Sequence, residues 1–548
     1  MPTTSGSSPS SPGDRGGYGL ARAVGVASLT VVLLTAVAFR VIALDRVPGI
    51  NGDEAYYPVT LMNLRDGQRQ VLTTGSGLPL NPLYAIPVYL LHAGHPTPSF
   101  ALVRLTAVLS GLLTLLLAYP LLARTTDRAT ALYATLMLAC LPTAIAYSRF
   151  GWDQSQAALV SLACVYASLK RSALGLALSY VMVLWVHPLN AFLAPVLLGP
   201  AAARELIAWG HLPRVDRGRH LRLLLAGLAA AVALAAGALL LTRHALGNGL
   251  SAALVGMAHR LFDVPGWLRF ATLIGDLLGG ATIYRYLAGE PSAGWLIPER
   301  LAFWSVVLVL GATVVPRWWR EQNALRLGLA GGLLTALVAF YLLLGDAGLT
   351  PGYERYAMWM VTPACVVGAS LLAGLGQSPA ARARQLGGLL VVCALLLVSF
   401  YSNYFHVLST TGGSAARAFR TGPIEPKQAA FEAIVTAAGY ATAITVLTED
   451  WWSFFPIRYL AFERPGMQVT LRDRGDRGEA TLTAGRRLFA VGFAGGPFDR
   501  WIAANAPAWS RQSMLDPAGR PVLHVWDLGR GSDDAARLLA AVAADVAY

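Results

Sequence analysis

The chain has 548 residues, of which 55% are hydrophobic and 13% charged, whereas soluble domains carry about 25% charged residues. This composition excludes an ordinary soluble domain and predicts a polytopic membrane protein. The formal net charge is +13. Almost all of it comes from arginines in short loops between apolar runs, where they orient a chain in the membrane, so we exclude nucleic acid as a partner.

Residues 1–17 are rich in Ser, Pro and Gly, which predicts a disordered cytoplasmic tail. Beyond them, apolar windows of the length that crosses a bilayer, about 17–25 residues, recur along the chain. We predict about eleven transmembrane helices from these windows, which lie near 20–44, 98–122, 129–148, 153–169, 172–186, 188–206, 222–242, 300–316, 324–344, 355–375 and 385–404.

The arginines test the orientation of these helices. If the N-terminus is cytoplasmic, every inner loop carries basic residues, from Arg124 and Arg128 in the first to Arg382 and Arg384 in the last. The outward segments are then residues 48–67, 148–156, 243–299, 345–355 and everything after about 405.

The segment beyond residue 404 differs in composition from the rest. Its patterns predict helices at 425–438 and 498–506, strands at 442–450 and 486–494, and a hairpin at 516–528. The predicted fold is therefore mainly α. It has a transmembrane domain over 18–404 and a small extracytoplasmic α/β domain over 405–548.

The first outward segment reads PGINGDEAYY and places Asp53 and Glu54 directly after the first apolar run. One interpretation is structural: Asn51 caps a helix that begins at Gly52, Glu54 completes a capping box, and acids favour a first turn. The other is catalytic. The residues that follow suit a helix lying at the membrane surface.

A second outward acid, Asp153, stands in RFGWDQSQ. By itself it is readily explained as a helix N-cap. The two loops belong to consecutive helix pairs, however, so they can converge on one cavity. Two carboxylates there suit an acceptor hydroxyl that must lose its proton as it attacks an electrophilic carbon. A leaving lipid phosphate needs only positive charge beside it, which arginine supplies.

Arg355 is the strongest candidate for that charge, since GYERYAMWM sets it between Glu354 and Tyr356 at the mouth of a late helix. The alternative for this segment is an interfacial anchor. Weaker candidates are Arg149, Arg285 and Arg300. His187, in WVHPLNAF, is a minor candidate for contacting phosphate or sugar, although a histidine beside proline is more often a structural hydrogen-bonder.

Together, the outward GDEAYY, the second Asp and the ERY segment resemble the GT-C membrane glycosyltransferases. The similarity is strongest to the branch with protein O-mannosyltransferases and lipid A aminoarabinose transferases (glycosyltransferase family 39-like). It covers roughly residues 20–400 and implies an inverting hexosyl- or pentosyltransferase that uses a polyprenyl-phosphate-linked sugar.

The resemblance also implies roles for individual residues. Asp53 would be the base, with Glu54 beside it, and Asp153 would match the second acidic position. Arg355 would lie near the donor phosphate, and we expect Tyr56 and Tyr57 of the same motif to contact substrate. The C-terminal domain matches no sugar-binding module and leaves the acceptor, whether glycan, lipid or protein, open.

Three alternatives remain at this stage. A divalent metal bridging Asp53, Asp153 and the phosphate is one, although two candidate protein oxygen ligands do not establish a site. A transporter or flippase for a lipid-linked glycan is another, but the charges concentrate at the ends of the spans rather than at the midplane. A non-catalytic envelope scaffold is the third. Richness in Arg, Ala and Gly suggests a bacterial plasma membrane as the location.

Overall fold

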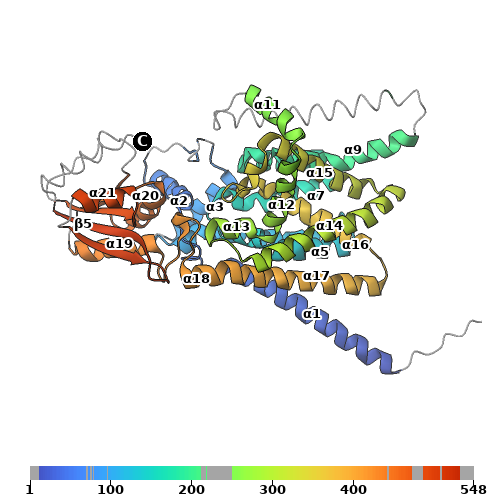
Figure 1. The fold of residues 1–548 in the computed structure, drawn as a ribbon, viewed down its shortest axis with the longest axis horizontal. Coiled ribbons are helices and arrows are strands. Elements are labelled where there is room, and N and C mark those ends of the chain that lie inside the picture. The colour runs from blue at the N-terminus through green and yellow to red at the C-terminus, as the bar shows by residue number, and fades with distance from the viewer. Residues whose placement is uncertain are drawn as a thin grey trace, which may run out of the picture.

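The computed structural model describes most of the chain. The described residues are 12–68, 72–74, 77, 79–95, 97–211, 218, 250–440, 443–471, 486–505 and 509–530. The predicted span at 222–242 and most of the predicted tail at 1–17 lie outside them. Figure 1 shows a helical body with a smaller, sheet-containing region at one end, and helices α2 and α3 between the two.

The regular elements in the described part of the first half of the chain are helices, apart from one isolated bridge between Thr73 and Pro79. The helices are α1 (Pro12–Val41), α2 (Gly52–Arg65), α3 (Pro82–Gly94), α4 (Phe100–Ala123), α5 (Arg128–Cys140), α6 (Pro142–Tyr147), the 3₁₀ helix η1 (Asp153–Gln156), α7 (Ala157–Leu169), α8 (Ala173–Val186), the 3₁₀ helix η2 (Pro188–Leu193) and α9 (Ala194–His211).

The second half continues this pattern before the sheet begins. Its helices are α11 (Leu250–Leu261), α12 (Val264–Gly279), α13 (Ala281–Leu287), α14 (Ala293–Arg320), α15 (Ala324–Leu344), η3 (Asp346–Leu349), η4 (Glu354–Met360), α16 (Val361–Gly374), α17 (Pro379–Phe400), the π-helical turn η5 (Tyr401–His406) and α18 (Val407–Thr411).

Several predicted windows are divided into shorter helices. The window at 129–148 divides at Leu141, because Pro142 starts α6 with its fixed φ. Among the described residues, six helices are long and apolar enough to cross a membrane, and three shorter apolar helices accompany them. The prediction of a mainly helical, multi-pass fold with a C-terminal α/β region is confirmed. Helical structure continues through α18, past the predicted boundary at 404.

The C-terminal region is a five-stranded mixed sheet with the strand order β2-β1-β3-β5-β4. The remaining elements, in chain order, are η6 (Arg417–Phe419), α19 (Pro426–Ala438), β1 (Ile444–Thr448), α20 (Trp451–Leu460), η7 (Ala461–Glu463), β2 (Met467–Leu471), β3 (Arg487–Phe493), α21 (Pro497–Asn505), β4 (Ser510–Leu515) and β5 (Pro521–Arg530). The helices, strands and hairpin predicted here all form, whereas α20 and β2 were not predicted.

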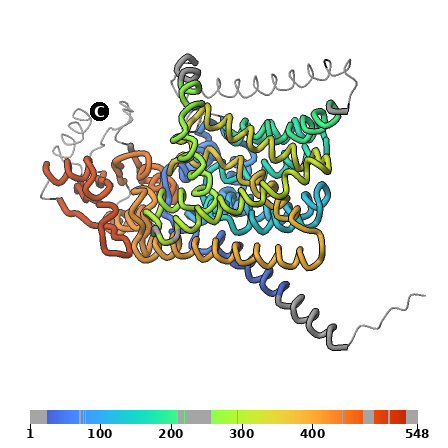
Figure 2. The backbone as a smooth tube through the Cα atoms, turned by 45° about the vertical axis from the view of Figure 1, so that its right-hand side comes forward, coloured from blue at the N-terminus to red at the C-terminus, as the bar shows by residue number. Residues whose placement is uncertain are grey.

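Helix α2 belongs by its packing to both parts of the molecule. Its residues Ala55, Val59 and Met62 are buried in one cluster with Phe431 of α19 and Phe455 of α20. On its other side, Tyr57 and Leu61 join the large core of the helical body. Figure 2 shows the early chain, in blue, reaching the orange and red C-terminal region. The GDE turn at the start of α2 is therefore held between the two parts.

Candidate active site

The start of α2 is fixed by a capping box. The side-chain oxygen of Asn51 accepts a hydrogen bond from the backbone N–H of Glu54 at 2.9 Å. In return, the Glu54 carboxylate accepts from the N–H of Asn51 at 3.3 Å. The structural interpretation of this turn is thus confirmed for Asn51 and Glu54. It leaves Asp53, one residue earlier on the helix, to point elsewhere.

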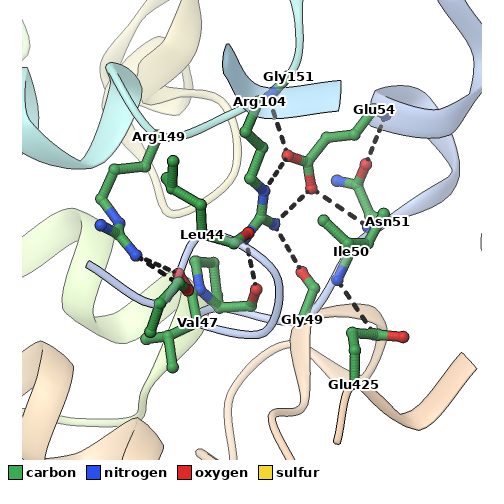
Figure 3. A network of polar contacts seen from close by, with 12 residues as sticks. Leu44, Val47, Gly49, Ile50, Asn51, Glu54, Arg104, Arg149, Gly151 and Glu425 are labelled. Atoms are coloured by element: carbon green, nitrogen blue, oxygen red, sulfur yellow. Dashed lines mark hydrogen bonds and ion pairs between the residues drawn. The ribbon is translucent and has the colours of Figure 1, made fainter. Parts of the chain in front are cut away.

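Glu54 is fully buried and paired with Arg104 of α4. Its two carboxylate oxygens accept from Arg104 Nε at 2.7 Å and Nη2 at 2.8 Å, a bidentate geometry (Figure 3). The backbone N–H of Gly151 also donates to Glu54, at 2.8 Å. Glu54 therefore joins the GDE turn to α4 and to the loop that precedes Asp153.

Arg104 has no N–H left for a substrate. Arginine carries five N–H donors, and besides the two on Glu54 the remaining three bond to the carbonyls of Leu44, Pro48 and Gly49, at 3.1, 2.8 and 3.1 Å. The side chain is fully buried. The Glu54–Arg104 pair is a closed structural network, so Glu54 is held behind the reactive surface and does not share the surroundings of Asp53.

Asp53 lies in a different setting, with 31% of its side chain exposed. One carboxylate oxygen accepts from the indole Nε1 of Trp451 at 3.1 Å, and the other lies 3.4 Å from Nη1 of Arg355. Burial raises the pKa of Asp53 above its ordinary value, and the charge of Arg355 and the Trp451 hydrogen bond oppose that rise. Asp53 is thus an accessible carboxylate between two donors.

Asp153 opens η1 and is buried. It accepts from the N–H of Gln154 at 2.9 Å and from the hydroxyl of Tyr57, and the charge of Arg355 acts on it as it does on Asp53. The ring of Tyr57 packs edge-to-face on Tyr84 at 4.9 Å. The structure therefore brings the two separate acidic turns together around one arginine.

Arg355, in η4, is the residue that links the cluster. Its Nη2 donates to the Tyr356 hydroxyl at 3.2 Å, and its guanidinium lies over the rings of Trp152 and Tyr356, at 5.4 and 5.1 Å from their centroids. Its Nε is buried and has no hydrogen-bond partner among the residues that the structure describes. Unlike Arg104, Arg355 retains unused donor capacity.

His187 and Glu354 flank this arginine. The His187 ring lies 4.8 Å from the Tyr356 ring, and its Nδ1 accepts from the N–H of Leu189 at 3.2 Å, as a helix cap. Glu354 is fully buried and accepts from the Tyr147 hydroxyl at 2.9 Å, while its second oxygen has no partner within the described part of the chain. Tyr56 donates to the carbonyl of Thr73 at 2.7 Å.

Three of the predicted arginines have their hydrogen-bond and ion-pair partners away from Asp53. Arg149 is buried and donates to the carbonyls of Phe39 and Val47, each at 2.6 Å, so its charge serves the loop after α1 (Figure 3). Arg285 pairs with Asp276 at 2.6 Å and with Glu290 at 2.8 Å. The weaker candidate Arg300 also pairs with Asp276. Sequence position alone does not show that Arg149 meets backbone carbonyls or that Asp276 of α12 pairs with Arg285 and Arg300.

The described residues offer few protein ligands for a divalent cation. Among the described residues, no group of three or more His, Cys, Asp or Glu side chains lies close enough to hold a metal ion. Asp53 and Asp153 are two carboxylates with a guanidinium acting on both; Mg²⁺ needs only one or two carboxylates when water and a substrate phosphate complete its ligands. Positive charge at this place comes from Arg355.

Sequence reasoning missed Arg104 and Trp451. Arg104 lies inside an apolar span, where an intramembrane charge is itself a signal of a specific partner. Trp451 follows Asp450, which caps α20 with its own capping box. The sequence signal for α20 was the pattern EDWWSF, an acidic cap before an aromatic run. Nothing in that pattern indicates that the indole reaches residue 53.

Comparisons with known proteins give structural similarity alone. No protein-family model matches the chain, and no curated protein does. Among solved structures, ArnT from Cupriavidus metallidurans bound to undecaprenyl phosphate is similar with a TM-score of 0.45 and 14% identity, over 91% of this chain and 97% of that one. The apo state of the same protein gives a TM-score of 0.46 and 13% identity, over 92% and 98%.

A third similar structure is the apo form of the Archaeoglobus fulgidus oligosaccharyltransferase, with a TM-score of 0.43 and 12% identity over 87% of this chain and 71% of that one. These are proteins of the class that the sequence motifs resemble. At TM-scores below 0.5 the similarity assigns no donor, acceptor or catalytic residue to this chain. Any role must come from the side chains of the chain itself.

Proposed function

We propose that this chain is an integral membrane glycosyltransferase. It moves a sugar from a polyprenyl-phosphate-linked donor to an acceptor hydroxyl, by inverting displacement at the outer face of the plasma membrane. The observation that supports this most is the pairing of a partly exposed carboxylate, Asp53, with an arginine that keeps a buried N–H unpartnered. A base and a phosphate-binding cation thus lie 3.4 Å apart.

The proposed step balances without a cofactor. The acceptor oxygen attacks the sugar C1, and its proton passes to the Asp53 carboxylate as the new C–O bond forms. The bond between C1 and the phosphate oxygen breaks on the opposite face, and its electron pair leaves with the lipid phosphate. The reacting carbon passes through an oxocarbenium-like state. Because the leaving phosphate is a stable anion, no general acid is required.

Arg355 has two tasks in this proposal. Its pair with Asp53 is long for a charge-assisted hydrogen bond, which ordinarily measures about 2.7–2.9 Å. A donor phosphate can therefore compete for the guanidinium, using the Nε proton and the loosely held Nη1. Binding of the donor then draws the cation away from Asp53 and frees the carboxylate to accept a proton. The aromatic rings of Trp152 and Tyr356 hold the guanidinium plane in place.

The other predicted site residues are assigned supporting roles around the Asp53–Arg355 pair. They are Asp153, Tyr57, His187, Glu354, Tyr356 and Tyr56. Asp153 is buried and accepts a hydrogen bond from Tyr57, so it is a less accessible base than Asp53. His187 and Tyr356 lie next to each other beside the guanidinium, where the sugar or phosphate would lie. Glu54 and Arg104 fix the turn from behind.

Charge and position support the proposed location at the outer face. The basic loops predicted to be cytoplasmic lie at the opposite ends of the spans from the GDE turn. The turn packs directly against the C-terminal α/β region. If that region is extracytoplasmic, the cluster is too.

The test is transfer by purified protein in detergent. Wild type and Asp53→Asn receive radiolabelled polyprenyl-phosphate hexose or pentose, and transfer is measured as loss of the lipid-linked label. We expect wild type to consume one of these donors and Asp53→Asn to retain its fold and lose that activity. Vesicles distinguish the transporter alternative: movement of an intact lipid-linked glycan across the bilayer without cleavage would contradict the proposal.

A further inference from the structure

Trp451 connects the C-terminal region to the proposed base. It is the first residue of α20, and Asp450 caps that helix by accepting from the N–H groups of Trp452 and Ser453, at 2.9 and 3.1 Å. The cap fixes the direction in which the first side chain of α20 leaves the helix. From there the indole reaches α2, on the far side of the boundary between the sheet region and the helical body.

The contact between Trp451 and α2 has both a polar and an apolar part. The indole N–H donates to one oxygen of Asp53 at 3.1 Å. The indole ring stacks on Tyr56 at 5.2 Å with an interplanar angle of 23°, and it packs on Phe455 of its own helix at 4.3 Å. Two rings, those of Tyr56 and Phe455, thus orient the indole, so the direction of its single N–H donor is set before any substrate arrives.

Gly52 shows how close this approach is. A Cβ atom added at Gly52 would collide with the carbonyl oxygen and the indole Cδ1 of Trp451. Because only glycine leaves room there, the backbone of the GDE turn and the start of α20 lie in direct contact. The glycine of the GDE motif is thus explained by the C-terminal region.

We infer that Trp451 is a positioning residue for the transfer reaction: its indole N–H holds one oxygen of the Asp53 carboxylate and leaves the other for the acceptor. The C-terminal α/β region therefore completes the active site. This inference rests on the proposed function of Asp53.

The physical reason lies in what Asp53 would do without the indole. A free carboxylate next to an arginine pairs with it through both oxygens, which is the favoured fork-to-fork geometry. Here one oxygen is held by Trp451 and only the other lies toward Arg355, at 3.4 Å. The indole is a donor without acceptor capacity, so it favours the ionised carboxylate and cannot take its proton. The indole thus favours the charged form of Asp53 while the pair with Arg355 stays long.

The test removes the indole N–H and keeps an aromatic ring at position 451. Trp451→Phe removes the donor, and incorporation of 3-benzothienylalanine at position 451 puts sulfur in place of the N–H in a ring of the same shape. A hydrogen bond to a charged group contributes about 1.5–3 kcal/mol, so we expect kcat to fall about tenfold or more. The KM for the polyprenyl-phosphate sugar should stay within about twofold, because Arg355 remains.

The pH profile separates positioning from a structural role. The charged groups that act on Asp53 are Arg355 and Glu54, and both remain in the variants. The indole hydrogen bond lowers the pKa of Asp53. Its loss should therefore raise that pKa and move the acid limb of kcat to higher pH. Trp452→Phe on the same helix, at a side chain 36% exposed, is the matched control and should leave both kcat and the limb unchanged.

A double substitution tests whether Trp451 acts through Asp53. Adding Trp451→Phe to Asp53→Asn should reduce the residual rate no further. If Asp53→Asn is inactive while both 451 variants show the wild-type rate and pH profile, this inference is wrong and the proposed function stands. If wild type consumes no donor, or Asp53→Asn is fully active, the proposed function fails and the inference fails with it.

Discussion

Two adjacent acids at the start of α2 have opposite surroundings. Glu54 is fully buried, and its partner Arg104 uses all five of its donors on protein acceptors. Asp53 is partly exposed, and its partner Arg355 keeps a buried N–H without a partner among the described residues. Both acids are charged partners of an arginine, and they are neighbours in the chain. What separates the structural pair Glu54–Arg104 from the proposed reaction centre is that all of its hydrogen-bond donors are used.

The division follows from helix geometry. Successive residues of an α-helix point about 100° apart, so neighbours in sequence face different surroundings. The capping box fixes that rotation, because it commits Glu54 inward toward Asn51 and Arg104. Asp53 is then directed toward Arg355 and Trp451. The fully bonded Glu54–Arg104 pair holds the turn from one side. Asp53 and Arg355 on the other side can therefore keep unused hydrogen-bonding capacity.

The largest expected effect comes from removing the proposed base. Asp53→Asn keeps the size and shape of the side chain and abolishes proton acceptance, so we expect the transfer rate to fall by about 10²–10⁴-fold. The measurement is turnover of labelled polyprenyl-phosphate sugar, with circular dichroism as the check on folding. Asp66→Asn at the other end of α2, where the side chain is 43% exposed, is the matched control and should keep the wild-type rate.

Breaking the closed network should affect stability first. Removing one partner of a buried ion pair costs about 3–5 kcal/mol, because the remaining charge is left unpaired. Arg104→Ala and Glu54→Gln should therefore lower the thermal midpoint in detergent, and Arg104→Ala should do so more, since five acceptors lose their donor. Wild-type thermal stability in Arg104→Ala would contradict the scaffold assignment.

Substitutions of Arg355 test the role of the arginine that keeps an unpartnered N–H. Arg355→Lys keeps the charge but loses the planar fork, so we expect the KM for the donor to rise about tenfold, and Arg355→Ala should lower kcat as well. Because the side chain is partly exposed and its pair with Asp53 is long, the thermal midpoint should change less than in Arg104→Ala. A variant that loses stability and keeps its donor KM would reverse the assignment.

The pH dependence has a definite sign. Burial raises the pKa of Asp53, so the base is lost on acidification at a pH where an ordinary aspartate is still ionised. Transfer should therefore fall with decreasing pH along a limb set by Asp53. For folding, a raised native pKa favours the protonated form, so stability from this group is present at low pH and lost as pH rises through the native pKa. Asp53→Asn should accordingly match or exceed wild type in thermal midpoint at neutral pH.

The smallest effect is expected at Arg285. It pairs with Asp276 and Glu290 and does not contact the cluster around Asp53. Arg285→Ala leaves Arg300 on Asp276, so the transfer rate and donor KM should both stay within about twofold of wild type. A rise in donor KM comparable to that in Arg355→Lys would place the phosphate near α13 instead.

The sequence predicted the helical body and most of the sheet region because both depend on periodic apolar patterns. It predicted the cap at Asn51, since a capping box is local. It also indicated that the loops with Asp53 and Asp153 would meet. For Arg149 and Arg285, two of the weaker candidates, it did not indicate the acceptors that the structure gives them, which lie 102 and 9 residues away in the chain.

Long-range contacts account for what could not be predicted. Glu54 and Arg104 are 50 residues apart, and Asp53 and Trp451 are 398 apart. Neither pair lies in one periodic pattern, one motif or one turn. The Asp53–Trp451 contact forms only because the C-terminal region packs on α2. Apolar patterns specify which face is buried, but they do not identify the distant side chain that meets a given carboxylate.

The most direct measurement is a structure of wild type with polyprenyl phosphate bound. The account predicts phosphate density in hydrogen-bond contact with the guanidinium of Arg355, beside the free oxygen of Asp53, with the Glu54–Arg104 pair unchanged behind it. Phosphate density on Arg285 and Arg300, with Arg355 still paired to Asp53, would contradict it.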